Sequence, residues 1–377
     1  MGGRAGRRQK GVAAIIDELI RGLPSSKWSQ ALHLLGLLFS LLAQVSFLVS
    51  FGVSFKKQSY DQSAVALFFV LGFCCVDYGL WIRGRRGTEA MVSLASLVDV
   101  LRSIETLAQD KATTAVEDKP GRRRALLMER VLQPLAIVSR TQSAAVSAVM
   151  VGLFLVSGSH FLPHWPTGNG HDLWEVAFML LHSGLICLGG TPYVILIALS
   201  WMSSLSMDVT LHLLADNVRE ARAWQELLPI IRLHQQLHDA FARVQGFFAE
   251  DMSVLTRIVF GLGVIGLLRA ALGTHDMTNL AIVALNFSHI AMACLSGELQ
   301  ESAGDDFHDA LCGCDWAAWP VADRTALQIV LTRTITPVQV KFRYFGAMRL
   351  VTLTNIFNSL FRCLQVLRAN LESTKWG

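Results

Sequence analysis

The stretch LVTLTNIFNSLFRCLQVL, residues 350–367, is the last of the apolar segments that decide the fold of this chain. It is long enough to cross the hydrocarbon core of a membrane, which takes roughly 17–25 helical residues. Six similar runs precede it: Ala31–Val53, Ala64–Ile82, Leu132–Val156, Leu173–Met202, Val254–Leu272 and Thr278–Leu295. The sequence therefore predicts an all-α membrane protein with seven transmembrane helices.

Composition supports this prediction. The 377 residues are 52% hydrophobic and 16% charged, whereas soluble globular chains have about 25% charged residues. The formal net charge is +4. Because the basic residues gather on one predicted side of the membrane, we interpret this charge as a topology signal and expect no nucleic-acid partner.

The placement of Lys and Arg predicts the orientation, because basic residues stay in cytoplasmic loops. The first 30 residues and the connection between the second and third spans are rich in them, whereas the loop between the third and fourth spans has none. The N-terminus is therefore predicted to be cytoplasmic, and seven spans place the C-terminus outside. A G-protein-coupled receptor would have the opposite orientation.

The N-terminal segment is predicted to form an amphipathic helix and lacks the features of a cleavable signal peptide. Its apolar residues recur at helical spacing, and we expect this face to lie on the membrane surface. These residues are Val12, Ile15, Ile16, Leu19, Ile20 and Leu23.

Three motifs suggest chemistry that their context does not favour. GLGVIG, residues 261–266, lies inside a predicted span, where its glycines favour close helix packing over nucleotide binding. HQQLH, residues 234–238, lacks the glutamate of a zinc protease and fits a solvated helix face. The seven cysteines have no metal-ligand spacing. We therefore expect no enzyme activity, no metal and no cofactor.

Charged residues within the spans have structural interpretations. Asp77 and Arg140 are expected to pair at similar depth, and Glu298 and Glu301 to mark the cytoplasmic end of the sixth span. The last span differs, because polar residues recur along it every three or four positions and form a stripe down one face. Such a stripe either packs against neighbouring helices or lines water. The stripe contains Asn355, Asn358, Ser359, Arg362 and Gln365.

The C-terminal third contains a series of residues in a fixed order: Cys294, Gly297 and Glu298, then Ser302, Ala310 and Trp316, then Arg333, Pro337 and Gly346, and finally Thr352 and Leu353. In identity and order these residues resemble the signature region of the insect odorant receptor family. LPHWP, residues 162–166, resembles the family's second extracellular loop. The sequence departs from the family at Cys363–Gln365, where a Ser-Tyr-Ser type run is usual, and at Arg362.

The resemblance implies an odorant-tuning subunit of a heteromeric, ligand-gated, non-selective cation channel in the plasma membrane of olfactory sensory neurons. Its partners would be a small volatile hydrophobic odorant, a shared co-receptor in a tetramer, and membrane lipids. The expected regions are a cytoplasmic N-terminal segment (1–30), transmembrane helices one to six (31–300), a cytoplasmic anchor (301–349) that includes Arg333 and Pro337, and a pore-lining last helix with an extracellular tail (350–377).

The resemblance further implies an odorant pocket in the outer half of the helix bundle, formed by the second, third, fourth and sixth spans. An apolar cage with a few polar groups suits a small volatile molecule. The residues expected to line it are Phe68, Phe69, Met150, Phe154, Ser157, Phe178, Met179, His182, Val283, Asn286 and Phe287. Packing between helices is the alternative interpretation for each of them.

Two other receptor classes remain open. A gustatory-receptor-like channel would share the orientation, but its last helix would carry a T-Y-x-x-x-L-x-Q-F type run that this chain lacks. A seven-helix receptor signalling through G proteins would need an extracellular N-terminus.

Overall fold

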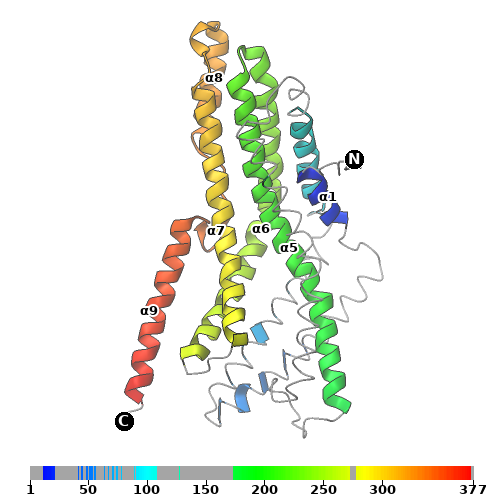
Figure 1. Ribbon diagram of the computed structural model, residues 1–377, viewed down its shortest axis with the longest axis vertical. Helices are drawn as coiled ribbons and strands as arrows, with labels where there is room; N and C mark the ends of the chain where they lie inside the picture. Colours follow the sequence, from blue (N-terminus) through cyan, green and yellow to red (C-terminus); the bar gives the residue numbers. More distant parts are fainter. Residues whose placement is uncertain are drawn as a thin grey trace, which may run out of the picture.

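The computed structural model describes residues 12–21, 91–107, 173–271 and 277–374, and isolated positions between 41 and 127. Within these residues the structure is almost entirely helical (Figure 1). Besides the helical stretch 91–107, the elements in chain order are α1 (Val12–Arg21), α5 (Leu173–Glu220), α6 (Trp224–Ala271), α7 (Met277–Cys312), the 3-10 helix η3 (Trp316–Ala318), α8 (Val321–Thr334), β1 (Lys341–Phe342), β2 (Gly346–Ala347) and α9 (Leu350–Thr374).

Three long helices form the body of the protein. Helices α5 and α6 have 48 residues each, or about 72 Å at 1.5 Å per residue, more than twice the hydrocarbon thickness of a membrane. In the described part of the chain, the stretches Ile197–Glu220 and Trp224–Arg269 are long and apolar enough to cross a membrane. The chain is an all-α membrane protein whose helices extend well beyond the bilayer.

The C-terminal halves of α5 and α7 and the N-terminal half of α6, which we call the helical extension, contribute to the buried apolar core. They run side by side, whereas α5 diverges from the other two helices at its N-terminal end (Figure 1). Phe241 of α6 and Phe307 of α7 are among the largest fully buried side chains. His234 stacks on Phe307 with ring centroids 4.3 Å apart. The expectation of a solvated HQQLH face is therefore wrong for His234, which is half-buried, and holds for His238, which is exposed.

Helix α1 forms as predicted, but its apolar face is not on the membrane surface. Ile16 is fully buried in the same core as Leu97 of the helical stretch 91–107. Arg102 pairs with Asp17 at 2.6 Å. Apolar residues at helical spacing indicate a buried face without saying what covers it, and here another part of the chain covers it.

The chain returns from the top of the helical extension through α8. Helix α8 packs on α7 and ends at Thr334, three residues before Pro337. This agrees with the prediction that Pro337 ends or bends the helix. A hairpin follows, formed by the two-residue strands β1 and β2 with Lys341 opposite Ala347. Helix α9 then leaves the bundle (Figure 1).

The predicted fourth, sixth and last spans lie inside α5, α7 and α9, and the fifth lies in α6 except for Leu272, which is outside the described residues. The first three fall mostly outside the described residues, so the number of spans and the sides of the termini stay predictions. Helices α5, α7 and α9 continue past the C-terminal ends of their predicted spans, whereas α6 begins well before its predicted span.

Candidate functional site

The start of α9 is held by one face of α7. We call residues 335–349, between α8 and α9, the linker. A side-chain carbon added at Gly297 of α7 would lie 2.0 Å from the carbonyl oxygen of Met348, and one at Gly304 would lie 2.9 Å from Pro337. Both glycines therefore allow the linker to approach the helix backbone closely.

Polar contacts follow the same face of α7. The Gln300 side chain donates to the carbonyl of Val338 at 3.2 Å, and Nδ1 of His308 lies 2.8 Å from the hydroxyl of Thr334 at the end of α8. Positions 297, 300, 304 and 308 are three or four residues apart, so they share one side of the helix. We call this set of contacts the α7–linker seam.

Two carboxylates of α7 fasten the first turn of α9. Glu301 pairs with Arg349, and Glu298 accepts a hydrogen bond from the backbone N–H of Leu350 at 3.2 Å. A negative charge at a helix N-terminus is stabilising because the N–H groups there lack partners within the helix. The sequence interpretation of these glutamates as markers of a span end missed this contact.

The hairpin sits on α6. The Arg343 backbone N–H donates to the Ser253 hydroxyl at 2.6 Å, and Phe342 is buried. Gly346 has φ +71°, a conformation that glycine adopts without strain. The hairpin thus fixes the direction in which the chain enters α9.

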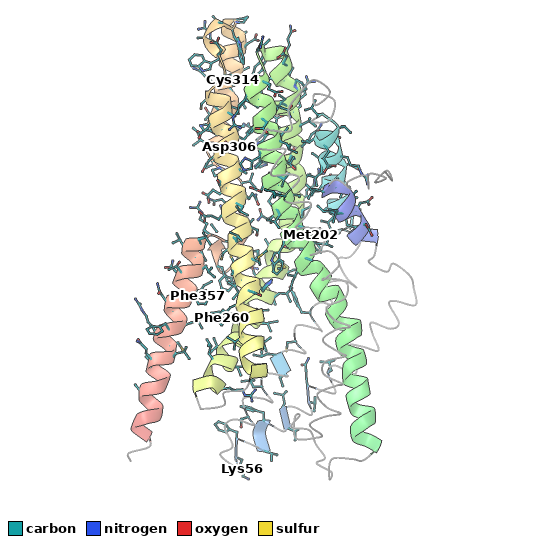
Figure 2. The ribbon with its side chains drawn as sticks, in the orientation of Figure 1. Lys56, Met202, Phe260, Asp306, Cys314 and Phe357 are labelled. Atoms are coloured by element: carbon teal, nitrogen blue, oxygen red, sulfur yellow. The ribbon has the colours of Figure 1, made fainter. Side chains whose placement is uncertain are left out.

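Helix α9 touches the rest of the chain along a narrow strip. Ile356 and Leu360 are buried, and the ring of Phe357, which Figure 2 labels on α9, lies 5.4 Å from that of Phe287 on α7. All members of the predicted polar stripe are exposed: Asn355, Asn358, Ser359, Arg362 and Gln365. The stripe therefore does not pack against the described helices of its own chain.

Apolar residues of α9 are exposed as well. Phe361 and Val366 have exposed fractions of 62% and 61%. Large apolar side chains on a membrane helix contact lipid or a neighbouring subunit, so α9 offers surface for both a polar and an apolar environment.

The predicted ligand pocket is only partly within the described residues. Phe287 lies 2.9 Å from where a Gly263 side chain would begin, and Val283 is buried. Gly263 therefore allows α6 and α7 to pack closely, as the sequence predicted. Phe178, Met179 and His182 are on α5, and Asn286 is on α7. Phe68, Phe69, Met150, Phe154 and Ser157 lie outside the described residues, as do Asp77 and Arg140.

A buried polar pair between α5 and α7 was not predicted. His289 is 5% exposed, and its ring lies against that of Trp201 with centroids 5.3 Å apart and a tilt of 33° between the ring planes. Within the part of the chain that the structure describes, neither ring nitrogen of His289 nor the indole nitrogen of Trp201 has a hydrogen-bond partner. Buried polar groups almost always have one. The sequence feature that could have indicated this pair is His289 itself, a histidine within an apolar run.

A charged cluster joins α5 and α7 within the helical extension. His212 Nδ1 lies 2.8 Å from a carboxylate oxygen of Asp306, which also pairs with Arg219 (Figure 2). Arg219 in turn contacts Asp216 at 3.2 Å. The two contacts to Asp306 join residues 94 and 87 positions apart. They fix the register of the two helices, which no local pattern could predict.

Comparisons with known proteins show which family the sequence matches and which solved structures have a similar fold. Residues 109–361 match the sequence model of the family described as 7tm Odorant receptor. The fold is similar to that of the insect olfactory receptor OR5 from Machilis hrabei, with a TM-score of 0.68, 13% identity, and coverage of 94% of this chain and 96% of that one. The same receptor in complex with eugenol gives a TM-score of 0.65 at 13% identity, covering 95% and 97%. No curated protein matches the sequence significantly.

Proposed function

This chain belongs to the 7tm odorant receptor family, and we propose that it is the odorant-binding subunit of a heteromeric, ligand-gated, non-selective cation channel. It would act in the plasma membrane of olfactory sensory neurons, with a cytoplasmic N-terminus and a shared co-receptor as its partner.

The observation that carries this proposal is the contrast between the two ends of α9. Its first turn is fixed to α7 by Glu298 and Glu301, whereas its polar stripe has no contact that would cover it within the described residues. A helix anchored at one end and polar on an uncovered face suits the wall of a water-filled pore shared between subunits.

The proposed ligand is a small volatile, hydrophobic molecule bound in the outer half of the bundle. Support comes from the related receptor of Machilis hrabei, whose structure was determined in complex with eugenol. In this chain the pocket would include His182 and Asn286 as polar contacts, and Val283 and Phe287 as part of its apolar wall. Burial of apolar surface would supply most of the affinity.

Phe287 offers a route from the proposed pocket to the pore. It contacts the backbone of α6 at Gly263 and the ring of Phe357 on α9. A ligand that prefers one position of Phe287 would therefore favour one position of α9. It can shift the gating equilibrium only by the difference in its affinity for the two states.

The co-receptor is inferred from the short connection between α5 and α6. Only residues 221–223 separate the two helices, whereas the family's shared co-receptor has a much longer intracellular loop there. The exposed apolar residues of α9 are consistent with subunit contacts.

The test is to express the chain in cells with and without an odorant co-receptor. Currents evoked by eugenol and a panel of volatiles would be recorded while G-protein signalling is blocked. The proposal predicts currents that need the co-receptor and survive the block. Currents that flow undiminished without the partner, or that disappear with the block, would overturn it.

A further inference from the structure

An open groove lies between the hairpin and α6, and its lining includes no residue of the proposed pocket or of the polar stripe. Its volume is about 410 Å³. The lining residues are Gly246, Ala249 and Glu250 of α6, and Lys341, Phe342, Arg343 and Gly346 of the hairpin.

The groove carries two cations and one carboxylate. Lys341 is exposed, and the side chains of Arg343 and Glu250 are 65% and 52% exposed and 3.5 Å apart. A weak, solvated pair of this kind leaves the guanidinium able to bind a second anion. The groove therefore has a net positive charge.

Both walls of the groove contain a glycine with open space beside it. Nothing lies within 4 Å of where a side chain would begin at Gly246 or at Gly346. A bulky anionic group could therefore approach the backbone from either wall. Phe342, which is buried, forms the floor.

The position of the groove points to a membrane ligand. Residues 246–250 precede the predicted fifth span, Val254–Leu272, by about one to two helical turns, which places the groove at the depth of lipid headgroups. Tyr344 at the tip of the hairpin is 57% exposed, with the Arg257 guanidinium 3.8 Å above its ring. Tyrosine and arginine at this depth are typical of a membrane interface.

We propose that this groove binds the phosphate-bearing headgroup of an anionic lipid of the cytoplasmic leaflet. Lys341 and Arg343 contact the phosphates, and Tyr344 lies among the headgroups. Because only two residues separate the hairpin from the first residue of α9, a bound lipid restrains the point about which α9 moves. The inference rests on the orientation given under the proposed function.

The test uses the full chain assembled with its co-receptor in phosphatidylcholine vesicles that contain a photoreactive phosphatidylinositol bisphosphate. Labelling of peptides from residues 241–257 and 338–350 is measured by mass spectrometry. Lys341→Gln combined with Arg343→Gln should lower this labelling about 10-fold or more, since each basic side chain near an anionic membrane contributes roughly a five-fold factor.

A second variant is expected to increase the labelling, so a loss of folding could not produce its result. Glu250→Gln removes the carboxylate that competes for Arg343 and should increase labelling several-fold. Arg232→Gln is the matched control, because Arg232 is an exposed cation of the same helix about 21 Å from Gly246. It should change nothing.

Competition with soluble inositol trisphosphate distinguishes a lipid headgroup from a free anion as the bound group. Weak competition by it supports a lipid site, whereas complete displacement at low concentration overturns the lipid assignment in favour of a free anion. Labelling that neither the double variant nor Glu250→Gln alters also overturns the proposal. Odour-evoked currents that still need the co-receptor would then show that the proposed function stands without it.

Discussion

Among the glycines that the structure describes, Gly297 has the least room for a side chain. Gly297→Ala should displace Met348 and the first turn of α9, because the added carbon would lie 2.0 Å from a carbonyl oxygen. Overpacking of this kind costs roughly 1–3 kcal/mol. We expect a lower melting temperature of the purified complex and smaller odour-evoked currents.

Gly261→Ala is the control for this substitution. Its added carbon would be 3.5 Å from Leu71, an ordinary van der Waals contact. Equal melting temperatures for the two variants would show that the close approach at Gly297 has no energetic role.

Glu105 gives the N-terminal contact a pH dependence. Burial raises the pKa of its carboxyl, although hydrogen bonds from the Ala13 and Val12 N–H groups and the charge of Arg102 lower it. The folded protein holds the Glu105 proton more tightly than the unfolded chain does. The stability that this proton contributes is therefore fully present below the ordinary carboxyl pKa. It is lost as the pH rises through the raised value.

Glu105→Gln should remove this pH dependence, because the glutamine amide does not titrate. Its oxygen can still accept the hydrogen bond from the Ala13 N–H, which is 3.2 Å long with Glu105. Hydrogen exchange of the α1 amides from about pH 4 to about pH 8, a range that brackets a raised carboxyl pKa, measures the effect. Protection should fall with rising pH in the parent and stay flat in the variant. Asp99→Asn, at an exposed position of the same helical stretch, should keep the parent's slope.

Between elements, the contact of α7 with α9 should couple ligand binding to gating. Phe287→Ala and Phe357→Ala should each shift the odour concentration that gives half-maximal current. Since the rings are in contact, the double variant should fall short of the sum by about 0.5–1.5 kcal/mol. Strict additivity would remove this contact from the gating route.

Arg362 places a positive charge on the exposed stripe of α9. If the stripe faces a cation pathway, Arg362→Gln should raise the single-channel conductance, because the charge repels permeating cations. Single-channel recording at low ionic strength would show the largest change, and an unaltered conductance would place Arg362 away from the pathway.

Elements could be predicted from the sequence better than the contacts between them. Apolar runs located four of the observed helices, and the three- and four-residue spacing of Asn355, Asn358 and Arg362 predicted a polar stripe without deciding whether it is covered; in the structure these residues are exposed. The α7–linker seam was beyond such reasoning, because its two hydrogen bonds join residues 26 and 38 positions apart. The role of Gly297 in allowing this close approach could be recognised only from the position of the Met348 carbonyl against it.

For the molecule as a whole, one principle connects these features: the chain fixes α9 at its first turn and leaves its polar face uncovered. The helical extension supplies the rigid part, through the core around Phe241 and Phe307 and the charged cluster at Asp306. Assembly could not be predicted from packing within one chain, because no described residue covers the exposed face of α9.

Cysteine accessibility in α9 during odour-evoked current tests whether this helix lines the pore. In a Cys363→Ser background, because Cys363 is itself an exposed thiol of α9, Asn358→Cys and Ser359→Cys would be compared with Ile356→Cys and Leu360→Cys in excised patches that contain no nucleotides. A charged thiol reagent should block the current in the first pair and not in the buried second pair. Block in neither pair, or no current at all without nucleotides, would contradict the claim that α9 lines the pore of a ligand-gated channel.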